Sequence, residues 1–383
     1  MAGAGLPGGD ESGQWDRGDT VEFGRQSRPL PRRLGLLLLT CLVVAAVVVV
    51  ITRPGSQRSA PSPPPVTVTD VGHPILGVHA AWQLYGFDRR AVVAVQFARG
   101  RIVRTTIPVL EGDGVVSMVA ASGEALVRPL DDVPGYIVPD GEPARPLTGV
   151  LAHGGTLLPG PTPAEQWLDE NAGGIVLVGH GKAERAQRAE RALLSPHSQT
   201  ITSDGAGGLL LVDESGVVYD VTRGLLRSVG NDLMLAVGPR NWLALNCGAN
   251  SGPCHQVVIS AATGAQRVLP GPAISANPWP WQALPGTVSP DGAVAAVVVH
   301  GQAQNQARLE LVSMRSGAGV QVPVRVTPSS TSQSLAWSPD SRWLFVVTAN
   351  GTLAVVDGRT GKPQHLSLGV SGLEQIVIRP AAG

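Results

Sequence analysis

Two cysteines separated by a short loop, Cys247 and Cys254, are the residues best placed to do chemistry in this chain. They lie at the base of a turn-rich loop between two apolar runs, 242–246 and 256–260. Opposed cysteines at such a loop base can meet the geometry of a disulfide. A metal site would have to recruit His255, and no second pair with ligand spacing accompanies it. We expect a disulfide that makes this loop rigid, with metal binding and free thiols as the alternatives.

The other residue types that often carry catalysis form no recognisable arrangement. The eight histidines are scattered, and neither a Gly-x-Ser-x-Gly nor a Ser-x-x-Lys sequence occurs. Gly179–Lys182 resembles a phosphate-binding loop, but position 176 is Val and Ala183 follows the lysine. Three pairs of adjacent acidic residues also occur, but the two members of each pair would point to opposite faces of a strand. We therefore predict no catalytic, cofactor-binding or metal-binding residue, while a site assembled from several distant loops stays open.

A segment rich in proline and tryptophan, 277–281, is the candidate for a contact with a partner. It reads Asn-Pro-Trp-Pro-Trp and contains Trp279 and Trp281. Proline rigidity lowers the cost of ordering such a segment on binding, and tryptophan is enriched at binding hot spots. Two interpretations stay open: the rings contact a protein or glycan partner, or they pack over the end of the domain as a lid.

The elements that would position these residues are short strands. From residue 66 onward, apolar runs of four to seven residues rich in Val and Leu alternate with turns that contain glycine. Residues 343–348 and 352–356 flank an Asn-Gly turn, which is a strong hairpin signal. One charged stretch, 183–194, fits either a short helix or a hairpin. The pattern predicts an all-β domain.

The strands recur with a period that indicates a particular all-β architecture. Turns at corresponding points between positions 113 and 380 are spaced by about 44 residues, and four-stranded propeller blades recur every 40–45 residues. The final run, 373–380, looks like the innermost strand of a blade that does not follow, and the segment 81–109 looks like a blade that lacks its innermost strand. Pairing the two would close the ring. We expect a β-propeller of seven four-stranded blades, with an irregular β-sandwich as the alternative.

Two turns carry a family resemblance. Ser289–Gly292 reads Ser-Pro-Asp-Gly, and Ser338–Ser341 reads Ser-Pro-Asp-Ser before Trp343 and Leu344. Over about residues 285–370 the sequence resembles the WD40-like propellers of the TolB type, whose repeat carries Ser-Pro-Asp-Gly followed by a Trp-Leu-type strand. The resemblance implies a propeller fold and commonly protein binding. It implies no catalytic centre, and the turn residues would be structural.

The N-terminal region has the pattern of a membrane anchor. Residues 34–52 form a run of 19 residues without a charge, long enough as a helix to span about 28 Å. Four arginines closely precede the run and two follow it, which places the N-terminus in the cytoplasm. We expect a disordered cytoplasmic tail at 1–33, a transmembrane signal-anchor helix at 34–52, a Pro-rich stalk at 53–65 and an extracytoplasmic propeller at 66–383. A cleaved signal peptide and a buried core helix are the alternatives.

The composition restricts the classes of function. Basic and acidic residues are equal in number, 29 each, so charge alone does not favour nucleic-acid binding. Three cysteines cannot make a disulfide scaffold, and 43% hydrophobic residues exclude a wholly disordered chain. We expect a membrane-anchored, non-catalytic binding or scaffolding module of a bacterial cell envelope, with a protein or glycan partner and no nucleic acid. The alternative is an extracytoplasmic propeller enzyme, hydrolase-like or lyase-like, with its site at the central channel.

Overall fold

The computed structural model describes residues 66–379 with several internal gaps, which are 89, 109–115, 130–133, 153–154, 170–174, 180–181, 186–199, 213–216, 223–224, 231, 248–252, 272–285, 301–306, 328–331, 365 and 367. The predicted tail at 1–33, transmembrane helix at 34–52 and stalk at 53–65 lie outside these residues. Among the residues described, no helix has the length and apolar character needed to cross a membrane.

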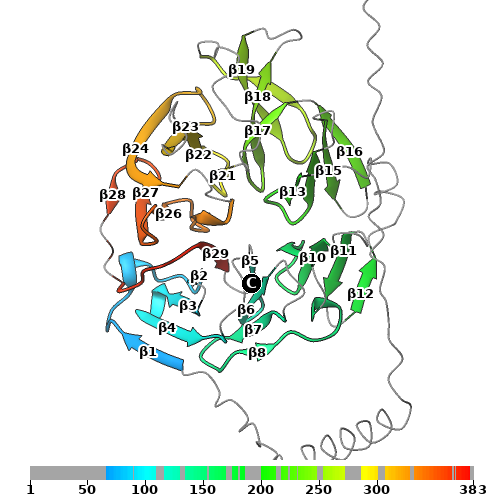
Figure 1. The fold of residues 1–383 in the computed structure, drawn as a ribbon. Coiled ribbons are helices and arrows are strands. Elements are labelled where there is room, and N and C mark those ends of the chain that lie inside the picture. The colour runs from blue at the N-terminus through cyan, green and yellow to red at the C-terminus, as the bar shows by residue number, and fades with distance from the viewer. Residues whose placement is uncertain are drawn as a thin grey trace, which may run out of the picture. The chain divides into compact units, whose positions relative to one another are not determined.

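This part of the chain is an all-β β-propeller, with its sheets placed around a common centre (Figure 1). Four sheets have four antiparallel strands each, in chain order. The first consists of β5 (Val116–Ala121), β6 (Glu124–Pro129), β7 (Tyr136–Pro139) and β8 (Arg145–Pro146). The second consists of β9 (Thr156–Pro159), β10 (Glu165–Asp169), β11 (Ile175–Gly179) and β12 (Lys182–Arg185). The third consists of β13 (Thr200–Ser203), β14 (Leu209–Val212), β15 (Val218–Thr222) and β16 (Leu225–Gly230). The fourth consists of β25 (Leu335–Trp337), β26 (Trp343–Val347), β27 (Leu353–Asp357) and β28 (Pro363–Gln364).

A larger sheet consists of two such four-stranded units side by side. Its strands are β17 (Leu233–Val237), β18 (Asn241–Cys247), β19 (Cys254–Ser260) and β20 (Gln266–Val268), then β21 (Gly286–Val288), β22 (Val294–His300), β23 (Ala307–Ser313) and β24 (Gly319–Val326). The units join where β17 and β21 pair in parallel, with Ala236 opposite Gly286. A Cβ atom at Gly286 would overlap the carbonyl oxygen of Ala296 on the neighbouring strand, so the close approach requires glycine there.

The remaining sheet contains both ends of the described chain. Its strands are β1 (Val66–Asp70), β2 (Gln83–Phe87), β3 (Ala91–Gln96), β4 (Arg101–Thr106) and β29 (Gln375–Arg379), in the order β1-β4-β3-β2-β29. β29 pairs antiparallel with β2, with Gln83 opposite Arg379. Figure 1 shows this red strand beside the cyan β2. The expected closure of the ring, in which the last strand completes the first sheet, is confirmed.

Short 3-10 helices complete the described elements. They are η1 (Ile75–Gly77), η2 (Phe97–Arg99), η3 (Gly149–Ala152) and η4 (Ser332–Ser334). The charged stretch at 183–194 begins within strand β12, and its part from residue 186 lies outside the described residues.

Aromatic residues fill the space between neighbouring sheets. The Trp82 ring packs on Phe97, with centroids 4.3 Å apart, and both contact Phe345 from another sheet, at 5.8 and 5.3 Å. The Trp167 indole N–H reaches the next sheet and donates to the carbonyl oxygen of Gly207 at 2.8 Å. Because each sheet is too small to bury its faces alone, this packing between sheets forms the core.

The Ser-Pro-Asp turns have the structural role that the resemblance implies. The Ser289 hydroxyl donates to the Asp291 carboxylate at 2.6 Å and accepts from the amide of Val294 at 3.0 Å. The second turn repeats this arrangement, and Ser341 there takes a left-handed φ of 60° where Gly292 has 75°. The serine in place of glycine is therefore accommodated without a change of turn.

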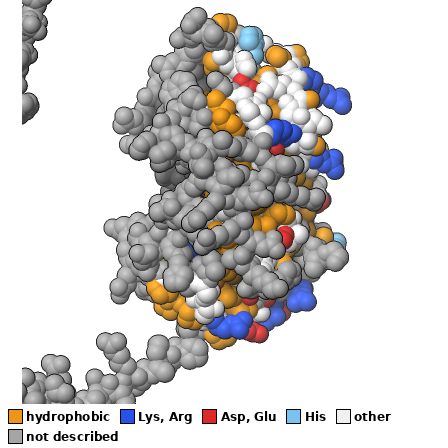
Figure 2. Space-filling view, turned by 90° about the vertical axis from the view of Figure 1, so that its right-hand side faces the viewer, with side chains coloured by type: hydrophobic (Ala, Val, Ile, Leu, Met, Phe, Trp, Pro, Cys, Tyr) orange, Lys and Arg blue, Asp and Glu red, His pale blue; other side chains and the backbone are white. Residues whose placement is uncertain are grey.

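The surface of the propeller carries its charges in small groups. On the face in Figure 2, Lys and Arg side chains lie toward one margin and at the lower edge, where they adjoin Asp or Glu side chains. Large apolar side chains are exposed at Val268 on β20 and Val320 on β24.

Candidate functional site

The best candidate for a binding site is a cavity of about 480 Å³ beside the ring closure. Its wall comes from the end of β29, the start of β2, the end of β3 and the turns β5–β6 and β9–β10. Backbone pairing around the ring brings these segments together, although they span most of the described chain. The polar residues that line it are Gln83, Gln96, Arg99, Ser122, Asp140 and Arg379.

Two glutamines of this cavity are buried without satisfying their amide oxygens. Gln83 and Gln96 lie directly opposite each other on β2 and β3, and they are 9% and 6% exposed. Neither Oε1 atom has a hydrogen-bond partner among the residues described, and neither does the indole N–H of Trp82, which is 2% exposed. An unpaired buried polar group costs about 1–3 kcal/mol. The Trp82 ring packs on the opposite face of the sheet, against Phe97 and Phe345, so the two glutamine oxygens are the unpartnered groups of this cavity that a ligand could satisfy.

A charged cluster stands beside these amides. The Tyr85 hydroxyl donates to one oxygen of Asp140 at 2.6 Å, and Arg379 donates to the other oxygen at 2.8 Å. The Arg379 guanidinium also lies 5.7 Å from the centre of the Tyr85 ring. Burial, followed by the hydrogen bond to Asp140, raises the pKa of Tyr85 well above its usual range. The cluster holds β29 and β2 to the sheet of β5–β8, and its phenol stays neutral.

A second cavity of about 430 Å³ adjoins the first. Ser122 and Pro163 line both, and the Ser122 amide donates to the Pro163 carbonyl oxygen at 3.1 Å. Glu124 and Gln166 line the second cavity. Burial raises the pKa of Glu124, and the nearby Arg145 partly opposes this. The bonded turns form the ridge that the two cavities share.

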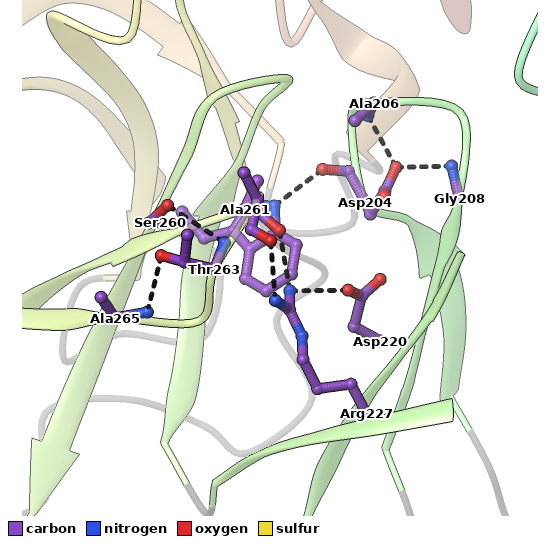
Figure 3. Close-up of polar contacts among 11 residues, drawn as sticks. Asp204, Ala206, Gly208, Asp220, Arg227, Ser260, Ala261, Thr263 and Ala265 are labelled. Atoms are coloured by element: carbon purple, nitrogen blue, oxygen red, sulfur yellow. Dashed lines mark hydrogen bonds and ion pairs between the residues drawn. The ribbon is translucent and has the colours of Figure 1, made fainter. Parts of the chain in front are cut away.

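An ion pair elsewhere in the ring is engaged in holding two sheets together (Figure 3). Arg227 on β16 donates to the Asp220 carboxylate on β15 at 2.7 Å. The same guanidinium donates to the carbonyl oxygens of Ala261 and Ala262, in the turn after β19, at 2.7 and 3.1 Å. These contacts connect neighbouring sheets, so we regard the ion pair as a structural latch.

Asp204 belongs to the same junction in Figure 3. Its carboxylate accepts from the amides of Ala206 at 2.6 Å and Gly208 at 2.8 Å, and its carbonyl oxygen accepts from the Trp242 indole at 2.9 Å. Burial raises the pKa of Asp204, while the backbone hydrogen bonds oppose the rise. These contacts fix a turn and a sheet interface.

Cys247 and Cys254 form the expected disulfide, at directly opposed positions of β18 and β19. Cys254 lies in the core, and the neighbouring His255 is exposed. Within the described ranges, no group of three or more His, Cys, Asp or Glu side chains could hold a metal ion. The disulfide prediction is confirmed.

The structure brings together residues that the sequence did not single out. Gln83, Gln96, Tyr85, Asp140 and Arg379 belong to no motif. The one local signal is a glutamine at the end of an apolar strand, since Gln83 is the first residue of β2 and Gln96 is the last residue of β3. The predicted contact residues, Trp279 and Trp281, lie in the gap at 272–285, outside the described residues.

Comparisons with known proteins find similarity to solved structures alone. No family model matches the chain, and no curated protein matches its sequence. An oligogalacturonate lyase in complex with manganese is similar in structure, with a TM-score of 0.46 and 11% identity over 77% of this chain and 90% of that one.

Two further solved structures are similar to the same extent. Apo AztD from Citrobacter koseri gives a TM-score of 0.45 and 12% identity over 78% of this chain and 98% of that chain. TolB from Acinetobacter baumannii gives a TM-score of 0.40 and 12% identity over 80% of this chain and 84% of that chain. The sheets of the chain form the β-propeller, and the chain is structurally similar to these proteins, TolB among them. The finer part of the TolB-type resemblance stays an expectation, since no family model matches.

Proposed function

We propose that this protein is a non-catalytic binding module of a bacterial cell envelope, with a protein or glycan partner. In this proposal residues 34–52 anchor it in the membrane, residues 1–33 are cytoplasmic, and residues 53–65 hold the propeller away from the bilayer on the extracytoplasmic side. We count the eight-stranded sheet as two blades, which gives seven blades, six with four strands and one, at the ring closure, with five.

The observation that carries the binding function is the set of unpartnered amide oxygens at Gln83 and Gln96 beside a cavity of ligand size. The enzyme alternative has weaker support at this place. Both oxygens of Asp140 are already engaged by Tyr85 and Arg379, so this carboxylate is not arranged as a free base.

Affinity capture with the full-length chain tests the binding function. The bait is the wild-type chain, and the matched control carries Gln83→Met and Gln96→Met, which keep side-chain length and remove the amide oxygens. We expect an envelope protein or glycan on the wild-type bait and much less of it on the control. Equal recovery on both baits, or no specific recovery on either, would contradict the proposed role of this cavity.

The anchor is tested separately. We expect the chain to fractionate with membranes and its mature form to retain the residues before 34. Mass spectrometry of the mature N-terminus measures this, and a protein that starts at or after Cys41 would contradict the signal anchor.

Substitution of Trp279 and Trp281 by Ala decides between a lid and a contact surface. Loss of a lid would lower the melting temperature strongly, whereas loss of a contact surface would leave it unchanged.

A further inference from the structure

We infer that the two adjoining cavities form one groove for a neutral oligosaccharide, with Gln83 and Gln96 accepting hydrogen bonds from its hydroxyls. This inference rests on the proposed binding function and assigns a ligand class to it. The groove runs from the ring closure, across the ridge at Ser122 and Pro163, to the cavity beside Glu124.

The unpartnered atoms match hydroxyl groups. Gln83 and Gln96 each offer an acceptor. A hydroxyl can donate a hydrogen bond to such an oxygen, whereas an ionised carboxylate or phosphate can only accept. Rotation about the last torsion of a glutamine exchanges its oxygen and nitrogen, so a bound hydroxyl can select the oxygen. Neighbouring hydroxyls of one sugar ring can reach neighbouring acceptors, as the opposed positions of the two glutamines require.

The charges of the groove favour a neutral ligand. Among the described residues that line it, the ionisable side chains are Arg99, Arg379, Asp140 and Glu124, so their formal charges cancel. Arg379 is already paired with Asp140 at 2.8 Å. The groove therefore offers no net charge that would attract an acidic or basic ligand.

The backbone around the glutamines leaves little for an extended peptide to pair with. Gln83 and Gln96 belong to β2 and β3, and each of these strands already has a neighbour on both sides. A peptide that adds to a sheet needs an unpaired strand edge. At this wall, recognition depends on side-chain groups, which suits a saccharide better than a peptide strand.

The length of the groove predicts a dependence on ligand length. The cavities of about 480 and 430 Å³ share only the ridge residues, so a short saccharide bound in one of them does not contact the other. A chain that crosses the ridge contacts both. We therefore expect longer oligosaccharides to bind more tightly than disaccharides.

Isothermal titration of the full-length chain tests the inference. The probes are linear neutral disaccharides, tetrasaccharides and hexasaccharides of glucose, mannose and galactose, with a uronic acid hexasaccharide and an uncharged hexapeptide for comparison. We expect one neutral series to bind with affinity that rises with length. Gln83→Met and Gln96→Met should each weaken that binding about tenfold, the effect of losing one hydrogen bond to the ligand.

Stability distinguishes a lost ligand contact from a damaged fold. Because the amide oxygens are unpartnered, both variants should melt at the wild-type temperature or above it. Gln321→Met, at an exposed position of β24, is the matched control and should bind as the wild type does. No binding of any neutral oligosaccharide, binding unaffected by both variants, or stronger binding of the uronic acid or peptide probe would overturn the inference. If affinity capture meanwhile yields a protein partner that depends on the glutamines, the binding function stands and only the saccharide assignment fails.

Discussion

Single side chains in this propeller hold neighbouring sheets to one another. Arg227 contributes an ion pair with Asp220 and two hydrogen bonds to backbone carbonyls of the next sheet. Its guanidinium also lies 5.9 Å from the centre of the Trp242 ring. A planar group with five donors suits such a junction, because it can serve a carboxylate and two carbonyls at once. The contribution of this latch can be measured by removing only the guanidinium.

Substitution of Arg227 by Met should lower the free energy of unfolding by about 2 kcal/mol, since charged hydrogen bonds are lost and the aliphatic stem is kept. Chemical denaturation measures the change. Arg308→Met, at an exposed position of β23, should change it by less than about 0.5 kcal/mol. Equal effects of the two substitutions would show that the latch contributes nothing specific.

Asp204 should make stability depend on pH. Burial raises the pKa of Asp204 in the folded protein above its ordinary value, so between these two pKa values the folded protein binds more protons than the unfolded chain. The stability contributed by Asp204 is therefore present at low pH and declines as pH rises through this window. Asp204→Asn lacks the titration, so its melting temperature relative to wild type should increase from about pH 4 to about pH 7. A constant difference across that range would contradict the raised pKa.

At the scale of elements, two links stabilise the propeller, one that closes the ring and one that closes a hairpin. β29 supplies the missing strand of the first sheet, and its Ile376 packs in a core cluster with Trp82 and Phe345. The β18–β19 hairpin is closed by the bond between Cys247 and Cys254. The first device joins the chain ends, whereas the second acts within one hairpin, so their loss should affect stability differently.

Substitution of Ile376 by Ala should lower the free energy of unfolding by about 3 kcal/mol, because it leaves a cavity between sheets. Val68→Ala on the exposed outer strand β1 should cost less than about 0.5 kcal/mol. Denaturant titration compares them. If Ile376→Ala were as mild as Val68→Ala, the closure by β29 would not be important for stability.

Replacing both Cys247 and Cys254 by Ala should lower the free energy of unfolding by about 2–3 kcal/mol, as loop-closure entropy gives for a small ring. Thermal melts under non-reducing conditions measure this, with Cys41→Ala as the control. The wild type should contain no more than one free thiol, the one at Cys41. Detection of three free thiols in the non-reduced protein would refute the disulfide.

At the scale of the whole molecule, the described strands form one closed ring. Strands β1 to β29 all lie between residues 66 and 379, and β29 pairs with β2 to close the ring. A chain that begins at residue 66 should therefore fold by itself and melt within about 2 °C of the full-length chain. Calorimetry measures both. A much lower melting temperature of the shorter chain would show that residues before 66 stabilise the propeller.

Local pattern determined much of this fold in advance. The apolar runs at 343–348 and 352–356 become β26 and β27, because apolar residues around an Asn-Gly turn favour a hairpin wherever they lie. The same reasoning placed the cysteines opposite each other, since they flank one short loop. The repeat of about 44 residues indicated a ring, and the unfinished ends indicated its closure.

The candidate site depended on tertiary structure. Gln83, Asp140 and Arg379 are separated by 57 and 239 positions along the chain, and no local pattern links them. They meet because β29 pairs with β2 while the sheet of β5–β8 packs alongside. Whether an amide is buried without a partner depends on every neighbour that surrounds it, and those neighbours come from distant sheets. The sequence by itself determined the strands, turns and disulfide, whereas tertiary packing decided which polar groups are left to meet a ligand.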